Sequence, residues 1–343
     1  MKRIGLIGCG KIAQIRHIPE LAEHPGAVIA GYYNPTRSRA EEMAAKYGGK
    51  VYPDIDAMLA DPEVDAVVIS LANQAHAEVT IQALKAGKDV LCEKPMATTL
   101  EECEAMMEAA LTTGRMLLIA QNQRLTQAHQ AARKMIAGGA VGKVLTFRTT
   151  FGHGGPEGWS INPGKGTWFF NKDAAAMGAM ADLGIHKTDL IQYLLGRKIT
   201  GVSALFATLD KTGPDDKPIP LEDNAVCLYR MEGGVVGTMT ASWTYYGEED
   251  NSTVIYGTEG ILRIYDRPGI PMQWIRKDGN VRNMDVETIQ TNDNQTRSGI
   301  ADALIEALET RDEGPLSAAT VLPAMKAVFA ALKSSEEGRF IEI

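Results

Sequence analysis

Short apolar runs alternate with longer stretches of helical periodicity from residue 2 to about residue 120. The β-branched and aliphatic runs predict strands at residues 3–7, 27–32, 66–70, 89–92 and 116–120. The stretches between them predict helices near residues 11–23, 38–47, 75–85 and 100–113. Strands that alternate with helices in this way are typical of a parallel sheet covered by helices on both faces.

The pattern changes after residue 121. It predicts a helix at residues 127–137, a Gly-Gly turn at 138–139 and a strand at 143–151. Residues 152–166 contain too many glycines and prolines for regular structure, so we interpret them as an active-site loop. From about residue 199 to residue 287, short alternating runs predict a mostly antiparallel sheet, and two helices follow near residues 296–310 and 318–334. We therefore predict an α/β chain of two domains, residues 1–121 and 122–343.

Composition supports this reading and excludes several classes of protein. A length of 343 residues suits two domains. The chain is 45% hydrophobic and 23% charged, which excludes disordered, collagen-like and disulfide-scaffold proteins. A net charge of −8 argues against nucleic acid or an anionic membrane as the main partner.

The cysteines indicate a reducing, cytoplasmic location. Cys9, Cys92, Cys103 and Cys227 form no C-x-x-C pair, and no histidine-rich tract accompanies them, so we predict no metal site. The apolar stretch before Cys9 is shorter than the ~7–15 residues of a signal sequence core. No uninterrupted apolar stretch approaches the ~18 residues of a membrane span.

The first predicted strand runs into a G-x-G-x-x-A motif at residues 8–13. In a dinucleotide-binding fold, Gly8 allows the tight turn, Gly10 lets the backbone approach a pyrophosphate, and Ala13 permits close helix packing. The amide groups that open the helix at Lys11 and Ile12 would face the phosphates. The alternative is a tight strand-to-helix turn without a ligand.

The end of the second strand bears on the choice of cofactor. NAD-binding folds usually place Asp or Glu there to bind the adenosine ribose, but this chain has Asn34 and no acidic residue from Ala27 to Ala40. Thr36, Arg37 and Arg39 follow, and guanidinium groups can neutralise a 2′-phosphate. The sequence therefore favours NADP over NAD, the alternative being that both arginines are solvated helix residues.

Glu93-Lys94-Pro95 follows the strand at residues 89–92. Open α/β sheets bind ligands beyond the carboxyl ends of such strands, so Lys94 is expected to face the cofactor crevice. Pro95 biases Lys94 away from helical backbone angles. The alternative is a solvated surface ion pair between Glu93 and Lys94.

A helix with spaced polar groups begins near Asp182. Spacings of three and four residues place Asp182, His186, Asp189 and Tyr193 along one face. A carboxylate four residues from an imidazole can fix its tautomer and support its protonated form, which suits proton transfer near neutral pH. The alternatives are a buried structural histidine or an i,i+4 metal pair, and no further ligand cluster supports the metal pair.

Together these features resemble the Gfo/Idh/MocA family of NAD(P)-dependent oxidoreductases, whose members include inositol and sugar dehydrogenases. The resemblance spans nearly the whole chain and rests on residues 5–13, 72–76, 86–95, 121–124 and 182–189. It implies a Rossmann NAD(P)-binding domain followed by a C-terminal α/β domain with a large open sheet. The exposed face of that sheet is expected to form a homodimer or homotetramer.

The resemblance also implies roles for single residues. Lys94, Asp182 and His186 match the catalytic positions of the family. Asn73, His76, Glu93 and Gln121 match its cofactor cleft, and they join the residues selected from the motifs: Gly8, Gly10, Lys11, Ile12, Asn34, Thr36, Arg37 and Lys94. The expected substrate neighbours are Arg124, Trp159, Trp168, Asp182, His186 and Tyr245, with Tyr246 an alternative to Tyr245.

The expected reaction is hydride exchange between a nicotinamide and a secondary hydroxyl or carbonyl of a sugar, polyol or related small molecule. His186 would take the hydroxyl proton, Asp182 would support the imidazolium, and Lys94 would stabilise the alkoxide. Two alternatives are an NAD-dependent glycosidase that uses transient oxidation and a non-catalytic NAD(P) sensor. The glycine-rich run before Asp182 is reduced to Ala176-Met177-Gly178, which leaves the shape of the substrate open.

Overall fold

The computed structural model describes residues 1–286 and 297–343, and the chain divides into two compact units. Within the described residues, the first unit contains residues 1–122 and 297–322, and the second contains residues 123–286 and 323–343. Sequence analysis assigns residues 297–322 to the second domain, so the compact units and the predicted domains differ in this segment. The expectations for residues 287 and 296 lie outside the described residues.

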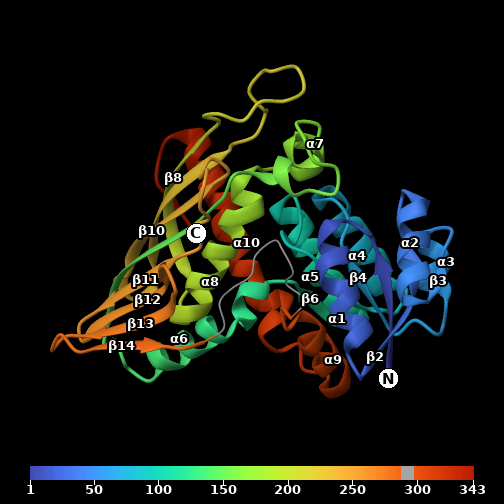
Figure 1. Cartoon of the computed structure of the whole chain (residues 1–343), viewed down its shortest axis with the longest axis horizontal. Helices are drawn as coiled ribbons and strands as arrows, with labels where there is room; N and C mark the ends of the chain where they lie inside the picture. The colour runs from blue at the N-terminus through green and yellow to red at the C-terminus, as the bar shows by residue number, and fades with distance from the viewer. Residues whose placement is uncertain (287–296) are drawn as a thin grey trace. The chain divides into compact units, whose positions relative to one another are not determined.

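The first unit contains a parallel sheet with the predicted alternation of strands and helices (Figure 1). In its described part the sheet has six strands in the order β3-β2-β1-β4-β5-β6. The strands are β1 (Lys2–Ile7), β2 (Ala27–Tyr33), β3 (Lys50–Val51), β4 (Ala66–Ile69), β5 (Asp89–Cys92) and β6 (Leu117–Ile119). All neighbouring pairs are parallel, which is the doubly wound order of a dinucleotide-binding fold.

Helices follow the strands of this sheet. They are α1 (Ile18–Glu23), α2 (Arg37–Tyr47), α3 (Ile55–Ala60), α4 (His76–Lys85) and α5 (Leu100–Thr113). The segment before α1, Ala13–His17, is π-helical, so the predicted helix at residues 11–23 is not a uniform α-helix. A capping box at Thr99 and Glu102 starts α5, which ends at Gly114 in the left-handed region. Sequence analysis missed β3 and α3 because both are short.

The late segment packs against the rest of the first unit through two buried carboxylates, Glu20 and Asp89. The Glu20 carboxylate accepts the backbone N–H groups of Ser298 and Ala301 at the start of α9 (Ile300–Thr310). Arg311 donates to Asp89 at 2.6 Å. An acidic side chain at a helix N-terminus is favourable because the unpaired N–H groups point at it. These polar contacts join single residues that are far apart in the sequence, and they leave no periodic pattern in it. The predicted domains therefore differ from the compact units in this segment.

The second unit contains a large mixed sheet. In its described part nine strands follow the order β14-β13-β12-β11-β7-β10-β9-β8-β15. They are β7 (Val144–Gly152), β8 (Ile199–Ala207), β9 (Asn224–Met231), β10 (Val236–Ser242), β11 (Thr253–Gly257), β12 (Gly260–Arg267), β13 (Ile270–Arg276), β14 (Val281–Met284) and β15 (Ile341–Glu342). The pairing of β7 with β10 is parallel and the other pairings are antiparallel, so the mostly antiparallel sheet is confirmed.

Helices lie against one face of this sheet (Figure 1). They are α6 (Gln127–Ala137), α8 (Ile185–Leu195) and the later part of α10 (Ala318–Glu337). The short helix α7 (Lys172–Ala175) contacts the 3₁₀ turn Trp168–Phe170 instead. A π-helical segment, Met180–Gly184, leads directly into α8. Nearly every side chain of α8 is buried, which explains its weak amphipathic pattern. Among the described residues, no helix is both long enough and apolar enough to cross a bilayer.

Candidate active site

The glycine-rich loop joins β1 to the helical segment after it. Gly8 has φ +102°, and a Cβ atom on it would lie 2.3 Å from the carbonyl oxygen of Ser70. A Cβ atom on Gly10 would meet only the Ser70 carbonyl oxygen within 4 Å, at 3.7 Å, among the described residues. Gly8 is therefore required by the backbone itself, whereas Gly10 keeps open space beside the loop. Lys11 and Ile12, at the start of the helical segment, are half-buried.

Asn34 is a structural partner of this loop. Its Oδ1 accepts the backbone N–H of Cys9 at 2.9 Å, and its Nδ2 donates to the carbonyl oxygen of Thr36 at 2.9 Å. The side chain, at the end of β2, therefore holds the glycine loop against the start of α2. Sequence analysis placed Asn34 where other folds have a ribose-binding acid, and here the amide fixes the loop.

The two arginines after Asn34 have different surroundings. Arg37 is exposed and pairs with Glu41 one helical turn later, which is the solvated arrangement weighed as the alternative. Arg39 lies near the glycine loop. Burial raises the pKa of the Cys9 thiol to about 12, and the charge of Arg39 opposes that rise. Arg39 therefore brings positive charge to the loop.

Glu93 is buried behind the carboxyl end of β5. Its Oε1 contacts His17 Nε2 at 2.7 Å, and its Oε2 accepts the backbone N–H of Lys94 at 3.0 Å. Burial alone would raise the pKa of Glu93, but His17, Arg16 and Lys94 outweigh it and lower the pKa to about 2. Glu93 is thus a buried anion that fixes the backbone of Lys94, which excludes the solvated ion pair.

His76 holds the other side of the same turn. Its Nδ1 contacts the carbonyl oxygen of Pro95 at 2.8 Å, and burial lowers the pKa of its imidazole. The Lys94–Pro95 peptide bond is cis. Lys94 itself is half-buried, and Asn73 lies buried in the turn before α4.

Gln121 follows β6, the neighbour of β5 in the sheet. It is 1% exposed, and neither its amide nitrogen nor its amide oxygen has a hydrogen-bond partner among the described residues. A buried amide without partners is costly unless a ligand or water completes it. The position, beyond the carboxyl end of a parallel strand, is where α/β sheets bind ligands.

In the second unit, Asp182 lies in the π-helical segment before α8. Trp243 Nε1–H donates to Asp182 Oδ2 at 3.0 Å, and His153 Nε2 lies 4.0 Å from the same oxygen. Asp182 is 6% exposed and His186 is 7% exposed, so the predicted pair is buried. π-Helical turns inside helices are frequent at functional sites because they re-aim side chains.

Sheet register brings His153 and Trp243 to Asp182. Strands β7 and β10 run parallel and pair Gly152 with Ser242, and the backbone N–H of His153 donates to Ser242 O at 3.0 Å. His153 directly follows Gly152 at the end of β7, and Trp243 directly follows Ser242 at the end of β10. They therefore leave the sheet side by side, although 90 residues separate them in sequence.

Aromatic rings surround the buried pair. Phe151 lies 5.9 Å from His186 and 6.0 Å from His153, between ring centroids. Trp159 lies 6.2 Å from His153. Trp168 stacks on Phe169 at 4.0 Å, and Phe169 contacts both Trp159 and Trp243. The two predicted tryptophans therefore join one aromatic wall around Asp182 and His186. The indole N–H of Trp159 has no hydrogen-bond partner among the described residues.

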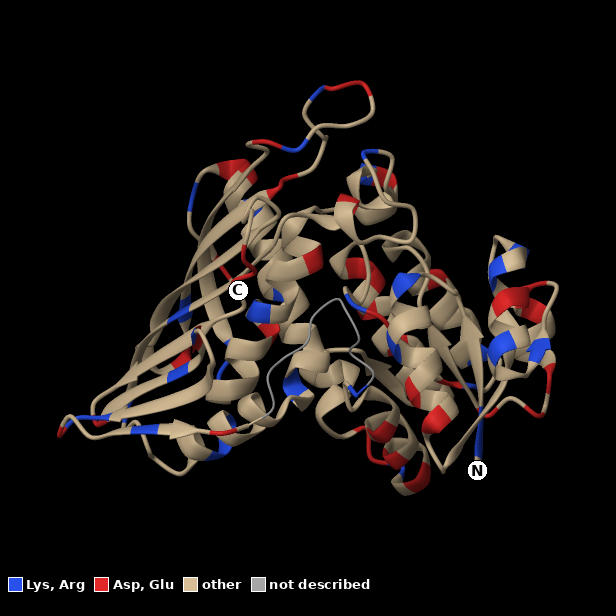
Figure 2. Ribbon diagram, in the orientation of Figure 1, with Lys and Arg blue, Asp and Glu red and all other residues tan. Residues whose placement is uncertain are grey.

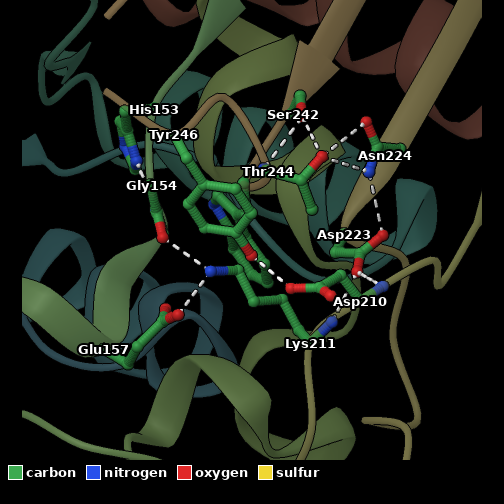
Figure 3. Close-up of polar contacts among 12 residues, drawn as sticks. His153, Gly154, Glu157, Asp210, Lys211, Asp223, Asn224, Ser242, Thr244 and Tyr246 are labelled. Atoms are coloured by element: carbon green, nitrogen blue, oxygen red, sulfur yellow. Dashed lines mark hydrogen bonds and ion pairs between the residues drawn. The ribbon is translucent and has the colours of Figure 1, made fainter. Parts of the chain in front are cut away.

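The predicted active-site loop is held by a lysine (Figure 3). Lys211 Nζ donates to the carbonyl oxygen of Gly154 at 2.6 Å and forms an ion pair with Glu157. The backbone of Lys211 is fixed in turn because its N–H donates to Asp223 at 2.8 Å. The side chain of Lys211 is 5% exposed. The loop contains one short 3₁₀ turn, Pro156–Gly158.

Other predicted substrate neighbours have structural contacts. Arg124 forms a two-pronged pair with Asp189, at 2.6 and 2.5 Å, and lies 5.3 Å from the Tyr193 ring centroid. These contacts orient α8 and give no support to a substrate role. The Tyr245 ring lies against Gly152, where a Cβ atom would approach it to 2.3 Å. Tyr246 is exposed and donates its hydroxyl to Asp210 (Figure 3).

Sequence analysis did not select several buried polar residues beside this site. These are His153, Lys187, Lys211, Glu222 and Trp243. Lys187 Nζ donates to the carbonyl oxygen of Asn251 at 2.9 Å, and burial lowers the pKa of its ammonium to about 7. His153 lies in the loop that sequence analysis interpreted as an active-site loop. A histidine in such a loop was the signal by which this residue could have been selected. Among the described residues, no group of His, Cys, Asp or Glu is arranged to hold a metal ion.

Comparison with known families decides the assignment of the chain. Residues 2–121 match the model of the GFO_IDH_MocA oxidoreductase family, NAD-binding Rossmann fold, and residues 129–263 match the GFO/IDH/MocA C-terminal domain. The chain belongs to the Gfo/Idh/MocA family. It is therefore an NAD(P)-dependent oxidoreductase, and the predicted Rossmann domain and the resemblance stated from the sequence are confirmed.

Individual relatives agree with this family assignment. Levoglucosan dehydrogenase of Pseudarthrobacter phenanthrenivorans is 33% identical over 66% of this chain and 63% of its own length. The scyllo-inositol 2-dehydrogenase (NAD(+)) of Bacillus subtilis is 30% identical over 76% of this chain and 73% of its own length. A solved structure of levoglucosan dehydrogenase with NADH and L-sorbose is 25% identical, with a TM-score of 0.88 over 100% of this chain and 99% of that one.

The residues of this Gfo/Idh/MocA protein fit a bound dinucleotide. The open space at Gly10 would admit a diphosphate to the backbone of the glycine loop, and the amides after it suit phosphate oxygens. The unpartnered amide of Gln121 can donate to and accept from a ligand at the edge of the sheet. When bound, the nicotinamide cofactor would supply the hydride donor or acceptor.

Proposed function

We propose that this enzyme oxidises a secondary hydroxyl of a sugar or polyol, or reduces the matching carbonyl, with a nicotinamide cofactor. The main support is the buried carboxylate of Asp182, held by Trp243 one helical turn before buried His186. A low-polarity, aromatic environment strengthens electrostatic interactions between such groups. Aromatic faces also suit the apolar faces of a sugar ring.

Each catalytic side chain has one task in this proposal. His186 accepts the hydroxyl proton at a ring nitrogen during oxidation and returns it during reduction. The Asp182 carboxylate stabilises the imidazolium formed in that step. Lys94 donates a hydrogen bond from its ammonium to the substrate oxygen, where negative charge develops. General acid–base catalysis of this type contributes about 10²–10⁴-fold.

We also propose that NADP(H) binds more tightly than NAD(H). Support comes from the lack of an acidic residue between Ala27 and Ala40, from the engagement of the Asn34 amide with the glycine loop, and from the charge of Arg39 near that loop. Titration of the protein with NADPH and with NADH tests this preference. Equal or tighter binding of NADH would contradict it. The Arg39→Ala variant should weaken NADPH binding selectively.

The exposed face of the nine-stranded sheet is the proposed contact between subunits of a homodimer or homotetramer. Leu205, Val226 and Leu228 are 67%, 52% and 51% exposed, and Leu205 pairs directly with Val226. Figure 2 shows long uncharged stretches along these strands. Adjacent exposed apolar side chains on one sheet face are typical of an interaction surface. We propose a cytoplasmic location as well, because all four cysteines are buried thiols.

Product analysis tests the proposed reaction. The protein is incubated with oxidised cofactor and a panel of polyols, free sugars and glycosides, and both nicotinamide reduction and sugar release are measured. Reduction that tracks loss of the substrate supports the proposal. Sugar release with the cofactor returned unchanged would identify a glycosidase. Cofactor binding without turnover of any compound would identify a sensor.

A further inference from the structure

The imidazole of His153 lies beside the buried Asp182 carboxylate. His153 directly follows β7, is 8% exposed, and places Nε2 at 4.0 Å from Asp182 Oδ2. This distance is longer than a hydrogen bond but well within electrostatic range in a buried site. Trp243 Nε1–H donates to the same oxygen at 3.0 Å. Two ring nitrogens therefore face a single oxygen of Asp182.

The backbone fixes which nitrogen of His153 carries the proton. The N–H of Gly155 donates to His153 Nδ1 at 3.0 Å. A backbone N–H can only donate, so Nδ1 must hold its lone pair, and the proton of the neutral ring is on Nε2. Protonation of Nδ1 would place two N–H groups against each other. His153 therefore presents an N–H dipole to Asp182.

The surroundings of the ring hold it in this orientation. Phe151 and Trp159 contact it edge-on, at 6.0 and 6.2 Å between centroids. The carbonyl oxygen of Gly154 is bound by Lys211, as Figure 3 shows beside His153. Charged or titratable groups on the packed elements include Asp182 before α8 and the Lys211–Glu157 pair on the loop side. They also include Lys187 on α8, with its Nζ 5.9 Å from the centroid of the Phe151 ring, and Glu222, which accepts the backbone N–H of Met180.

We propose that His153 is a positioning residue for the Asp182–His186 pair: its Nε2–H acts with Trp243 on Oδ2 of Asp182 and limits how strongly this carboxylate holds a proton on His186. The inference rests on the proposed function. A carboxylate that accepts a hydrogen bond from Trp243 and also faces the N–H dipole of His153 attracts the imidazolium proton less. The imidazole then returns to its neutral, proton-accepting form at lower pH.

Two substitutions separate the contributions of the two ring nitrogens of His153. His153→Asn places an oxygen near Nδ1 that can accept the Gly155 N–H, but it lacks the Nε2–H. His153→Gln can place an N–H near Nε2, but it lacks the Nδ1 acceptor. We expect the acidic limb of the kcat/KM profile to move to higher pH by roughly half a unit in H153N. We expect kcat of H153N at low pH to fall several-fold. The acidic limb of the kcat/KM profile of H153Q should stay at its wild-type pH. An unchanged limb in H153N, or the same shift in both variants, would overturn the inference.

A second measurement does not depend on turnover. The chain has four tryptophans, so the indole N–H resonance of Trp243 can be assigned by NMR with a Trp243→Phe variant. That resonance should move in H153N and stay near its wild-type position in H153Q. Failure of His186→Ala to reduce turnover, with this pattern intact, would overturn the proposed function alone. An unmoved Trp243 resonance in H153N would overturn the inference about His153.

Discussion

Trp243 donates its indole N–H to Oδ2 of Asp182 at 3.0 Å. Trp243 is fully buried, so this hydrogen bond is shielded from water and charge-assisted. The parallel pairing of β7 with β10 places Trp243 beside His153, and the π-helical segment before α8 presents Asp182 to both. The orientation of this candidate catalytic carboxylate therefore depends on the sheet register as much as on the helical segment that carries it.

Replacing Trp243 by Phe should remove this donor and keep most of the ring packing. We expect kcat to fall about 10-fold, because an orienting contact supplies part of the ~10²–10⁴-fold of acid–base catalysis. Cofactor binding should be unchanged. Steady-state kinetics and cofactor titration measure both effects. The control is Trp274→Phe, which removes an indole donor to Ala140 in the same unit, away from Asp182. Equal loss in both variants would assign the effect to general destabilisation.

Gly10→Ala separates folding from cofactor binding. A Cβ atom at Gly10 meets nothing closer than 3.7 Å in the described chain, so the melting temperature should stay near that of the wild type. The methyl group would occupy space that the backbone leaves for a diphosphate, so cofactor affinity should fall about 10-fold or more. Gly8→Ala is the comparison, since its Cβ would lie 2.3 Å from Ser70 O and should reduce stability as well. Wild-type affinity in Gly10→Ala would remove the glycine loop from the cofactor site.

Lys211→Met should loosen the loop that starts at His153. The variant leaves the Gly154 carbonyl and Glu157 without their cation, which is unfavourable for partly buried groups. We expect KM for the best sugar or polyol to rise about 3–10-fold with a smaller change in kcat. A double-mutant cycle with Glu157→Gln should give a coupling of about 1 kcal/mol. Lys217→Met removes an exposed ion pair with Asp215 and should leave KM unchanged.

The buried carboxyl group of Glu222 should make the free energy of unfolding depend on pH. Burial raises the pKa of its carboxyl to about 7, although backbone N–H groups such as that of Met180 oppose the rise. The folded state therefore keeps a proton that the unfolded state releases above about pH 4.5. The associated stability is fully present below pH 4.5 and is lost as the pH rises from there to about 7.

Glu222→Gln removes this titration while keeping an acceptor for Met180. Urea unfolding should show the variant to be more stable than the wild type at pH 8 by about 1–3 kcal/mol, and similar to it at pH 5. Substitution of exposed Glu248 by Gln should not change the pH dependence. A parallel pH dependence in Glu222→Gln and the wild type would contradict this assignment.

Leu228→Asp tests the proposed subunit contact. Leu228 is on the exposed face of β9, so a carboxylate there should not disturb the core but would oppose burial between subunits. Light scattering should show a homodimer or homotetramer for the wild type and a smaller species for the variant. Leu111→Asp, at a leucine of α5 that is 78% exposed, controls for the added charge. A monomeric wild type would contradict the proposal.

The parallel sheet could be predicted because its signals are local. Apart from β3, the strands of the first unit are short, mainly apolar runs. Residues 8–13 contain Gly8, which has a positive φ, and Gly10, which keeps open space beside the loop. The Asp182–His186 spacing is also local. By contrast, β3 and β15 have two residues each, which is too short for a periodic pattern, and α9 docks on the first unit through single contacts such as that of Glu20.

The partners of the candidate catalytic pair could not be found in this way. Trp243 is 61 residues from Asp182 and is brought to it by a parallel pairing of strands that are not consecutive in the chain. Asn34 was selected for its position at the strand end, but the direction of its side chain depends on where the glycine loop lies. Arg124 likewise has an unpredicted partner, Asp189, which sequence analysis placed on the face of Asp182 and His186.

The most direct test of the account is the turnover of His186→Ala and His186→Asn relative to the wild type, with the cofactor and substrate selected from the panel. We predict a loss of about 10²–10⁴-fold in nicotinamide reduction, with cofactor affinity unchanged. Turnover equal to that of the wild type in either variant, with the same pH profile, would contradict the assignment of the proton-transfer group.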